Sequence, residues 1–374
     1  MTRAQLLIAD SEKNANLYYA TRFLAPDPFI FLQVNGRTLL VMSDLELDRA
    51  KAQAKVDEVL SYTKVAQQAR QRLNAEATML DVVDEILKAR QATAVEVPMD
   101  FGVGYADGLR KRAYEVIATP EPFFPQRLVK SEEEIASLTQ TLRATEDALE
   151  SAIELIRNAE IQSNGTLWIG SKPLTTEMVR KVLHMRLLER DCVGQHTIIA
   201  CGAQAVDPHN EGSGPLRANE PIVMDVFPQH ADTRYFADIT RTVVKGKAAP
   251  NVRQMFGAVR EGQEIAFRMI KDGVDGSAVH RAILASFDSL GFRTGEQNGR
   301  MQGFFHGTGH GVGLEIHEPP RISPRQDTLK AGMVVTVEPG LYYVEAGGMR
   351  LEDMVVVTND GCRVLTPAPK IWEV

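Results

Sequence analysis

Three of the eight histidines of this chain lie within twelve residues, in the glycine-rich stretch from Phe305 to Pro319. They are His306, His310 and His317. A neutral imidazole is the commonest metal ligand in proteins and a general base near neutral pH. The glycines allow close backbone packing and conformations that a Cβ atom would forbid. A surface loop with scattered histidines is the simpler interpretation, but carboxylates elsewhere in the chain favour a catalytic metal site.

Four acidic residues lie in or beside segments whose apolar character predicts buried strands. They are Asp225, Asp238, Glu338 and Glu352. A buried, unpaired carboxylate is costly, so four together require cations. Two divalent ions would balance the four charges, and His310 can supply a fifth ligand. Because most donors are oxygen, we expect Mn²⁺, with Co²⁺ or Zn²⁺ as alternatives. Adjacent metal ions can share and deprotonate a water to give a hydroxide nucleophile, which predicts hydrolysis of an amide bond.

In order and local setting these five residues resemble the ligands of the pita-bread metallopeptidases, which include aminopeptidase P, prolidase and methionine aminopeptidase. The resemblance covers about residues 130–367. Its most specific part is the stretch His-Gly-x-Gly-His-Gly-x-Gly-Leu-x-x-His-Glu-x-Pro. The N-terminal domain and the sequence Arg127-x-x-Lys130-Ser131-x-x-Glu134-Ile135 resemble the creatinase, aminopeptidase P and prolidase branch.

The resemblance implies a role for each residue of the site. Two metal ions would be bound by Asp225, Asp238, His310, Glu338 and Glu352. Among these five ligands, Asp238 and Glu352 would bridge the two ions. The resemblance also implies that His306 and His317 contact the substrate and stabilise the tetrahedral intermediate. His209 matches the family histidine upstream of the first aspartate, and we expect it to act in catalysis and substrate contact. Arg350 matches an arginine that tethers a carboxylate or carbonyl of the substrate. The two-residue period of a strand would place Arg350 on the same face as Glu352.

The turn from Phe227 to Asp232 departs from the family pattern. Thirteen positions separate Asp225 from Asp238, two more than is usual in the family. An even insertion preserves the strand register, so both carboxylates can still converge. We expect Phe227 and Pro228 to form a wall of the substrate pocket, and we assign His230 no role. Glu318 and Asp353 adjoin site residues but should point away from the site.

The elements that hold these residues divide into two regions. In the first, a hairpin from Phe29 to Met42 turns at Asn35-Gly36. Helices near 75–90 and 104–113 and strands at 94–97 and 114–117 predict an α/β domain over residues 1–119. Clustered prolines predict a linker at 120–130. A capping box of Ser131 and Glu134 then begins a helix.

The second region, residues 131–374, mixes helices and strands. Helices are expected at 175–189, 252–271 and 277–290, and strands at 197–200, 222–226, 239–244, 333–338 and 349–357. The predicted fold class is α+β, and the resemblance implies a pita-bread catalytic domain with a curved antiparallel sheet and outer helices. The smaller creatinase-type α/β domain precedes it.

Composition limits the partners and the location. The net charge is −7 and no run of lysine or arginine occurs, which argues against a nucleic-acid-binding surface. Three widely spaced cysteines indicate a reducing compartment. No signal-peptide core or run of membrane-spanning length is found, so we expect a cytoplasmic protein without membrane contact. A homodimer is a separate expectation.

The predicted function is hydrolysis of the Xaa-Pro bond by a dinuclear metal exopeptidase. Its substrates would be short peptides with proline at the second position. The motifs do not separate an Xaa-Pro dipeptidase such as prolidase from an Xaa-Pro aminopeptidase. Two alternatives are a creatinase-like amidinohydrolase and a catalytically inactive binding module. All five ligands and the three other histidines are present, which argues against both.

Overall fold

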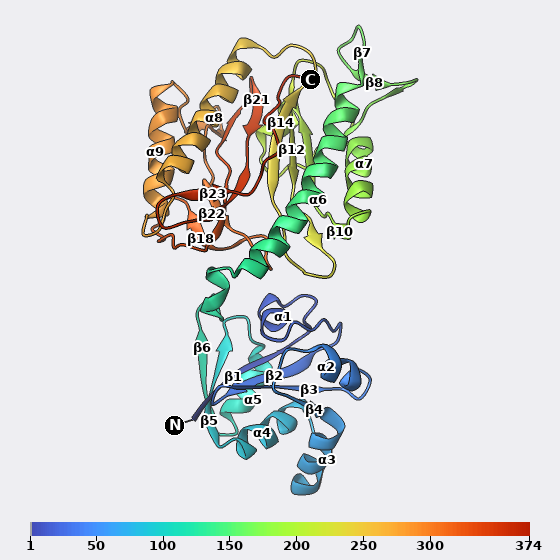
Figure 1. The fold of residues 1–374 in the computed structure, drawn as a ribbon, viewed down its shortest axis with the longest axis vertical. Coiled ribbons are helices and arrows are strands. Elements are labelled where there is room, and N and C mark those ends of the chain that lie inside the picture. The colour runs from blue at the N-terminus through green and yellow to red at the C-terminus, as the bar shows by residue number, and fades with distance from the viewer. Residues whose placement is uncertain (1) are drawn as a thin grey trace. The chain divides into compact units, whose positions relative to one another are not determined.

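The computed structural model describes residues 2–374, and the chain divides into two compact units, Met1–Arg127 and Leu128–Val374. The first unit contains a six-stranded sheet with the order β4-β3-β2-β1-β5-β6 (Figure 1). Its strands are β1 (Thr2–Ala9), β2 (Phe29–Val34), β3 (Arg37–Met42), β4 (Glu58–Ser61), β5 (Ala92–Pro98) and β6 (Glu115–Thr119). Its helices are α1 (Ala15–Thr21), α2 (Leu47–Gln53), α3 (Tyr62–Leu73), α4 (Met79–Ala89) and α5 (Val103–Arg110).

Strand β2 shows why this sheet is covered on both faces. Ile30 and Leu32 pack with α3, α4 and α5, whereas Phe29 and Phe31 pack with α1 and α2. A strand that is buried on both faces is apolar at nearly every position, and in β2 only Gln33 is polar. The predicted hairpin is present, and both Asn35 and Gly36 have the positive φ that a tight two-residue hairpin turn requires.

The segment expected to be a linker packs into the first unit. Phe123 and Phe124 are buried against the α1 and α2 side of the sheet, because two adjacent aromatic rings can remove a large apolar area from water. A short 3₁₀ helix, Pro125–Leu128, follows. Helix α6 (Glu132–Arg157) then begins at the predicted capping box of Ser131 and Glu134.

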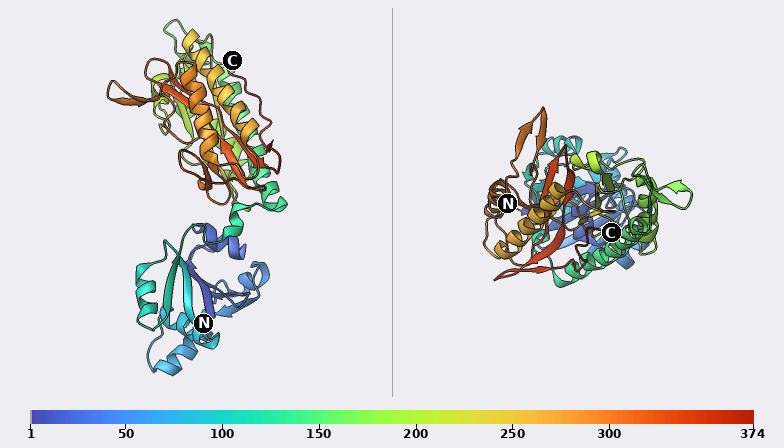
Figure 2. Two further views of the ribbon diagram at one scale, coloured as in Figure 1. Left: turned by 90° about the vertical axis from the view of Figure 1, so that its left-hand side faces the viewer. Right: turned by 90° about the horizontal axis from the view of Figure 1, so that it is seen from above.

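The second unit contains two helix pairs and several small antiparallel sheets (Figures 1 and 2). Helices α6 and α7 (Thr176–Leu188) pack beside the sheet β11-β12-β14. Helices α8 (Pro250–Met269) and α9 (Gly276–Ser289) pack beside strands β18, β20 and β21. The main strands are β11 (Ile198–Cys201), β12 (Pro221–Val226), β14 (Ile239–Val244), β17 (Gly309–Gly311), β18 (Glu318–Ile322), β19 (Val334–Val337), β20 (Gly340–Tyr343), β21 (Gly347–Arg350), β22 (Asp353–Val357) and β23 (Cys362–Val364).

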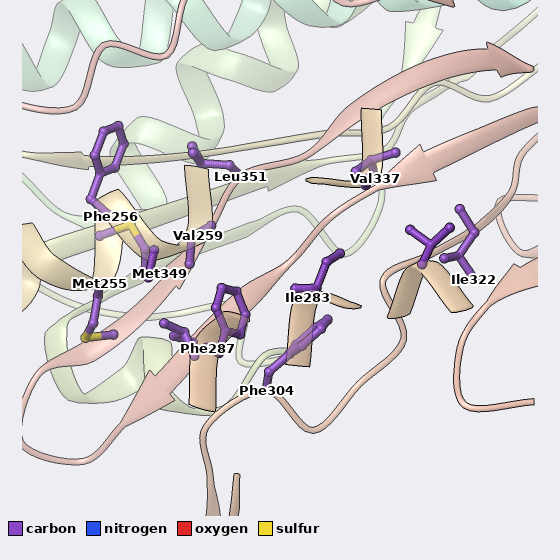
Figure 3. Close-up of a cluster of buried hydrophobic side chains, with 14 of the residues drawn as sticks. Met255, Phe256, Val259, Ile283, Phe287, Phe304, Ile322, Val337, Met349 and Leu351 are labelled. Carbon is purple, nitrogen blue, oxygen red and sulfur yellow. The ribbon is translucent and has the colours of Figure 1, made fainter. Parts of the chain in front are cut away.

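Short strands complete this unit. They are β7 (Glu160–Ile161), β8 (Leu167–Ile169), β9 (Lys172–Pro173), β10 (Cys192–Val193), β13 (Gln229–His230), β15 (Gly295–Gln297) and β16 (Arg300–Gln302). A core between the α8–α9 pair and the strands supports the second half of the unit, and it includes Phe256, Phe287, Met349 and Leu351 (Figure 3).

One predicted strand is interrupted where it matters for the site. The expected strand 349–357 is two strands, β21 and β22, that belong to different sheets. Leu351 and Glu352 lie in the break, where the Glu352 amide donates to the Thr240 carbonyl at 3.0 Å. Arg350 and Glu352 therefore do not share one strand as predicted, but their side chains lie on the same side, because both contact the Thr240 hydroxyl. Among residues 2–374, no helix combines the length and apolar character needed to cross a membrane.

Candidate active site

The five residues predicted to bind metal come from different elements and meet at one cavity. Asp225 lies in β12, Asp238 precedes β14, His310 lies in β17, Glu338 follows β19, and Glu352 lies between β21 and β22. The cavity has a volume of about 700 Å³, and all five line it. His209, His306, His317 and Arg350 line the same cavity, so the structure brings together all nine residues singled out in the sequence.

Glycines in β17 make this convergence possible. A Cβ atom on Gly309 would lie 1.9 Å from the Thr336 carbonyl oxygen, so only glycine lets β17 approach β19 this closely. The His310 amide donates to the Thr336 hydroxyl at 3.1 Å, and the Glu338 amide donates to the Thr308 carbonyl at 2.7 Å. His310 and Glu338 are thereby held side by side.

The ring of His310 is oriented as a metal ligand would be. Its Nδ1 atom lies 3.1 Å from the Gly311 carbonyl, which can only accept a hydrogen bond, so in the neutral ring the proton is on Nδ1. Its Nε2 atom lies 3.3 Å from Glu338 Oε1 and 3.7 Å from Asp238 Oδ2. Two ligand atoms about 2.1 Å from one ion lie at most about 4.2 Å apart, so both distances fit a shared metal ion.

Without a cation, the ionised forms of the carboxyl groups in this cluster are disfavoured. Burial, together with the charges of Glu352 and Asp225, raises the pKa of Asp238 well above its ordinary value. Burial, with the charges of Glu338 and Asp225, does the same to the pKa of Glu352. Burial raises the pKa of Glu338 to about 7, with Arg350 opposing and Asp225 adding to the effect. Asp238 Oδ1 and Glu352 Oε1 are buried without a hydrogen-bond partner, and ligand atoms of Asp238, His310 and Glu352 lie within 4.8 Å of one another. These features fit a divalent cation.

The Thr240 hydroxyl lies between the carboxylates of Asp225 and Glu352. It lies 2.9 Å from Asp225 Oδ1 and 2.8 Å from Glu352 Oε2. A hydroxyl has one proton, so it can donate to only one of these carboxylates at a time. It also accepts a hydrogen bond from Arg350 Nε at 3.2 Å.

Arg350 is committed to protein acceptors. Its Nη2 atom donates to Asp225 Oδ2 at 2.7 Å and its Nη1 atom donates to the Tyr342 hydroxyl at 2.7 Å. Burial opposes the charged form of Arg350, but Tyr342 and the carboxylates of Asp225 and Glu338 raise its pKa above the ordinary value, so it remains charged. Arg350 therefore holds Asp225, and tethering a substrate would require it to release one of these partners.

Tyr342 extends this chain of hydrogen bonds to His306. The His306 Nδ1 atom lies 2.8 Å from the Gly307 carbonyl, which places the proton of the neutral ring on Nδ1. Its Nε2 atom, 3.0 Å from the Tyr342 oxygen, then accepts the Tyr342 hydroxyl proton. Burial, followed by the charge of Arg350, lowers the pKa of His306 to about 3, so the ring is neutral. Burial raises the pKa of Tyr342 to about 12. The sequence patterns did not indicate Tyr342, because a tyrosine in an apolar strand has no distinguishing signal.

His317 and two arginines line the cavity and are available to a substrate. The rings of His317 and His310 lie 4.4 Å apart and nearly perpendicular. Burial lowers the pKa of His310 to about 3, and burial and then Arg321 lower that of His317, so both are neutral. Arg321 and Arg325 also line the cavity, and neither was predicted. In the sequence, only the positive charge of these two residues near the proposed metal ligands could have indicated them.

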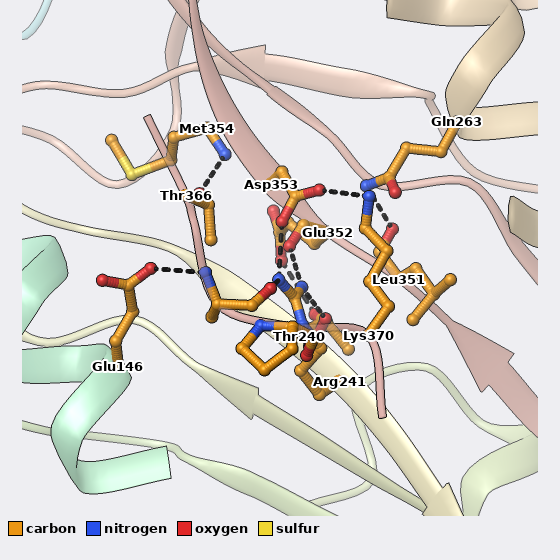
Figure 4. A network of polar contacts seen from close by, with 12 residues as sticks. Glu146, Thr240, Arg241, Gln263, Leu351, Glu352, Asp353, Met354, Thr366 and Lys370 are labelled. Carbon is orange, nitrogen blue, oxygen red and sulfur yellow. Dashed lines mark hydrogen bonds and ion pairs between the residues drawn. The ribbon is translucent and has the colours of Figure 1, made fainter. Parts of the chain in front are cut away.

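Behind Glu352 lies a buried polar network (Figure 4). Arg241 donates to the Glu352 carbonyl at 2.7 Å, to the Asp353 carboxylate at 2.8 Å and to the Ala368 carbonyl at 2.8 Å. Lys370 pairs with the other Asp353 oxygen at 2.9 Å. Asp353 thus points away from the cavity as predicted, and the network supports the break that carries Glu352.

Other predictions near the site have mixed outcomes. Phe227 lines the cavity as expected, whereas Pro228 is not among the lining residues. His230 is buried with its Nε2 atom 2.9 Å from the Gln140 side chain, outside the cavity lining. Glu318 pairs with Lys130 and also points away from the cavity.

A curved set of antiparallel strands with outer helix pairs, holding carboxylates and an imidazole in one cavity, defines a metal-dependent hydrolase with a pita-bread fold. Metallopeptidase family M24 matches residues 136–359, more than half of the chain, and the chain belongs to this family. The predicted family and the predicted enzyme class, a metallopeptidase, are therefore confirmed.

Relatives and solved structures match nearly the whole chain. An Xaa-Pro dipeptidase from Pyrococcus furiosus is 29% identical over 360 residues, which is 95% of this chain and 91% of that protein. An X-Pro aminopeptidase structure from Thermotoga maritima has a TM-score of 0.82 at 24% identity and covers 100% of this chain and 98% of that one. An Xaa-Pro dipeptidase structure from Bacillus anthracis has a TM-score of 0.83 at 24% identity and covers 100% and 95%. These similarities confirm the predicted fold.

Proposed function

We propose that this protein hydrolyses the Xaa-Pro bond of short peptides with two divalent ions, which we expect to be Mn²⁺. The observation that carries the proposal is the cluster of Asp225, Asp238, His310, Glu338 and Glu352 around a cavity, with two buried carboxylate oxygens lacking a partner. Asp225, Asp238, His310, Glu338 and Glu352 would hold the ions. When bound, the ions supply an activated water and polarise the scissile carbonyl.

The other residues of the cavity bind and orient the peptide. Neutral His317 can donate or accept a hydrogen bond at the reacting carbonyl, and His306 is held in one tautomer by Tyr342. His209 lines the cavity and can contact the N-terminal part of the substrate. Arg350 keeps Asp225 in place and, through Tyr342, orients His306.

Two arginines in the cavity lining favour a dipeptidase over an aminopeptidase. They are Arg321 and Arg325, and a guanidinium can bind a carboxylate through two parallel hydrogen bonds. In a dipeptide the free carboxylate of proline is only a few bonds from the scissile carbonyl, so it can reach such a group. The related Xaa-Pro dipeptidase agrees with this choice. The cytoplasmic location and the homodimer remain predictions.

The proposal is tested with purified protein that has been stripped of metal and reloaded with Mn²⁺. Xaa-Pro dipeptides, Xaa-Pro-Yaa tripeptides and Xaa-Ala dipeptides are compared by kcat/KM. We expect hydrolysis of Xaa-Pro dipeptides, weaker hydrolysis of tripeptides and little of Xaa-Ala. Preference for tripeptides would identify an aminopeptidase, and no hydrolysis with Mn²⁺, Co²⁺ or Zn²⁺ would refute the proposal.

A further inference from the structure

Two charged residues of the sequence motifs have no role in the chemistry described above. One is Lys130, just before helix α6, and the other is Glu318, the residue after His317. In the structure the Lys130 ammonium pairs with Glu318 Oε1. Their side chains are only 1% and 6% exposed, and neither lines the cavity.

Glu318 fills the inside of the loop that joins His310 to His317. Residue 311 pairs with Glu318 between β17 and β18, with an irregular register next to His310. A Cβ atom on Gly313 would lie 2.5 Å from Glu318 Oε1, so the carboxylate is packed directly against the Gly313 backbone. Residue 313 must therefore be glycine to leave room for the Glu318 side chain.

The start of α6 holds a second loop of the site in a similar way. The Tyr235 hydroxyl donates to Glu134 Oε1 at 2.6 Å, and Tyr235 lies three residues before Asp238. The Phe236 amide donates to the Gly313 carbonyl at 2.8 Å. Lys130 and Glu134 thus contact two loops that are joined to each other at Gly313.

Stability alone does not account for a buried ion pair at this place. Desolvating both charges costs about as much as their attraction returns, and apolar residues of similar volume often serve equally well. We infer that Lys130 and Glu318 form a positioning pair, which fixes the loop from Gly311 to His317 and so aims the His317 imidazole at the substrate. The inference rests on the proposed function for its catalytic consequence, but not for its effect on the loop.

The first test is Glu318→Gln, which keeps the shape of the side chain and removes its charge. Hydrogen–deuterium exchange of the metal-free protein should increase in peptides covering 311–317 and remain unchanged over β19. With Mn²⁺ loaded, kcat on an Xaa-Pro dipeptide should fall on the order of 10- to 100-fold, because small displacements of a catalytic group are costly. Metal content should equal that of the parent protein.

A second comparison asks whether Glu318 acts through His317. In a His317→Ala background, Glu318→Gln should lower kcat further by less than about 2-fold, because coupled residues are not additive. An equal loss in both backgrounds would overturn the inference, as would parental kcat and parental exchange in Glu318→Gln.

A third comparison separates positioning from folding. The double variant Lys130→Met with Glu318→Leu has no buried charge, so its Tm should recover relative to Lys130→Met alone, while kcat remains low. Recovery of kcat together with Tm would show that the pair is only structural and overturn the inference. As a matched control, Asp81→Asn breaks the Asp81–Arg112 pair of the first unit and should lower Tm without lowering kcat. If the parent protein hydrolyses no Xaa-Pro peptide, the proposed function fails, whereas the exchange measurement still decides whether the pair fixes the loop.

Discussion

Replacing Tyr342 by phenylalanine removes one oxygen atom and should disturb two side chains of the site at once. The Tyr342 hydroxyl accepts from Arg350 Nη1 at 2.7 Å and lies 3.0 Å from His306 Nε2. Without it, Arg350 has a buried N–H group that lacks this acceptor. His306 loses the group that holds its ring, which can then rotate or change tautomer. Asp225 keeps its bonds to Arg350 Nη2 and Thr240, so the proposed metal ligands themselves are not changed.

The size of the effect follows from the two hydrogen bonds. A bond to a charged group contributes about 1.5–3 kcal/mol and a neutral one about 0.5–1.5 kcal/mol, so unfolding should become easier by about 3 kcal/mol. For a unit of this size that corresponds to a Tm lower by roughly 6–12 °C. If orienting His306 contributes about 1.4–2.7 kcal/mol to the transition state, kcat falls roughly 10- to 100-fold.

The adjacent residue provides the control. Tyr343 is also a strand tyrosine, but its hydroxyl donates to the Arg293 carbonyl at 3.0 Å and it does not line the cavity. Tyr343→Phe should therefore retain the parental kcat. Both variants are loaded with Mn²⁺, their metal content is measured, and kcat and KM are determined on an Xaa-Pro dipeptide. If Tyr342→Phe keeps the parental kcat, the chain from Arg350 through Tyr342 to His306 has no part in catalysis.

Four further outcomes follow from the same geometry. Asp238→Ala should lose most of the bound metal by elemental analysis, since the proposed bridging carboxylate would hold both ions; parental metal content would remove Asp238 from the site. Arg321→Met should raise KM for Xaa-Pro dipeptides on the order of 10-fold and change tripeptide hydrolysis little, because only the dipeptide places its carboxylate there; equal effects on both would exclude that role. Phe227→Ala, which widens the cavity, should raise the tripeptide-to-dipeptide ratio of kcat/KM, and an unchanged ratio would mean that another wall selects length. Although burial opposes it, hydrogen bonds from Thr78 and Arg112 lower the pKa of Asp81 to about 2 from 3.8, so the first unit should lose about 2 kcal/mol of stability as the pH falls from about 4 through 2. Unfolding of the parent and Asp81→Asn proteins across this range should converge at low pH, and a constant difference would contradict the assignment.

The five residues that meet at the cavity could be singled out in the sequence because their acidic members break a strong local rule. A carboxylate in an otherwise apolar strand, such as Asp225 after Pro221–Met224, is costly unless a cation is present. The glycines around His310 added a second signal, and the close approach of Gly309 to Thr336 shows its cause. These signals depend on residues near each other in the chain.

The partners of Arg350 could not be predicted in this way. Strand periodicity indicates on which face a side chain lies, but not where a strand leaves its sheet. The break at Leu351 and Glu352 depends on Arg241 and on the C-terminal residues Ala368 and Lys370, which are distant in sequence. Helix α3 was also missed, because only Val65 and Ala69 of its twelve residues are buried, and this is too weak an apolar stripe to indicate a helix.

The site therefore forms where two groups of strands meet, and local sequence patterns indicate the acidic residues of each group. Asp225 and Asp238 belong to the strands beside α6 and α7, whereas Glu338 and Glu352 belong to the strands beside α8 and α9. The halves are joined at Thr240, whose hydroxyl contacts one carboxylate of each pair and whose carbonyl accepts the Glu352 amide. When the halves come together, the four carboxylates have Arg350 as their charged partner, which pairs with Asp225 at 2.7 Å. A cation that fits between the halves therefore compensates for a cost that is largest when both are folded together.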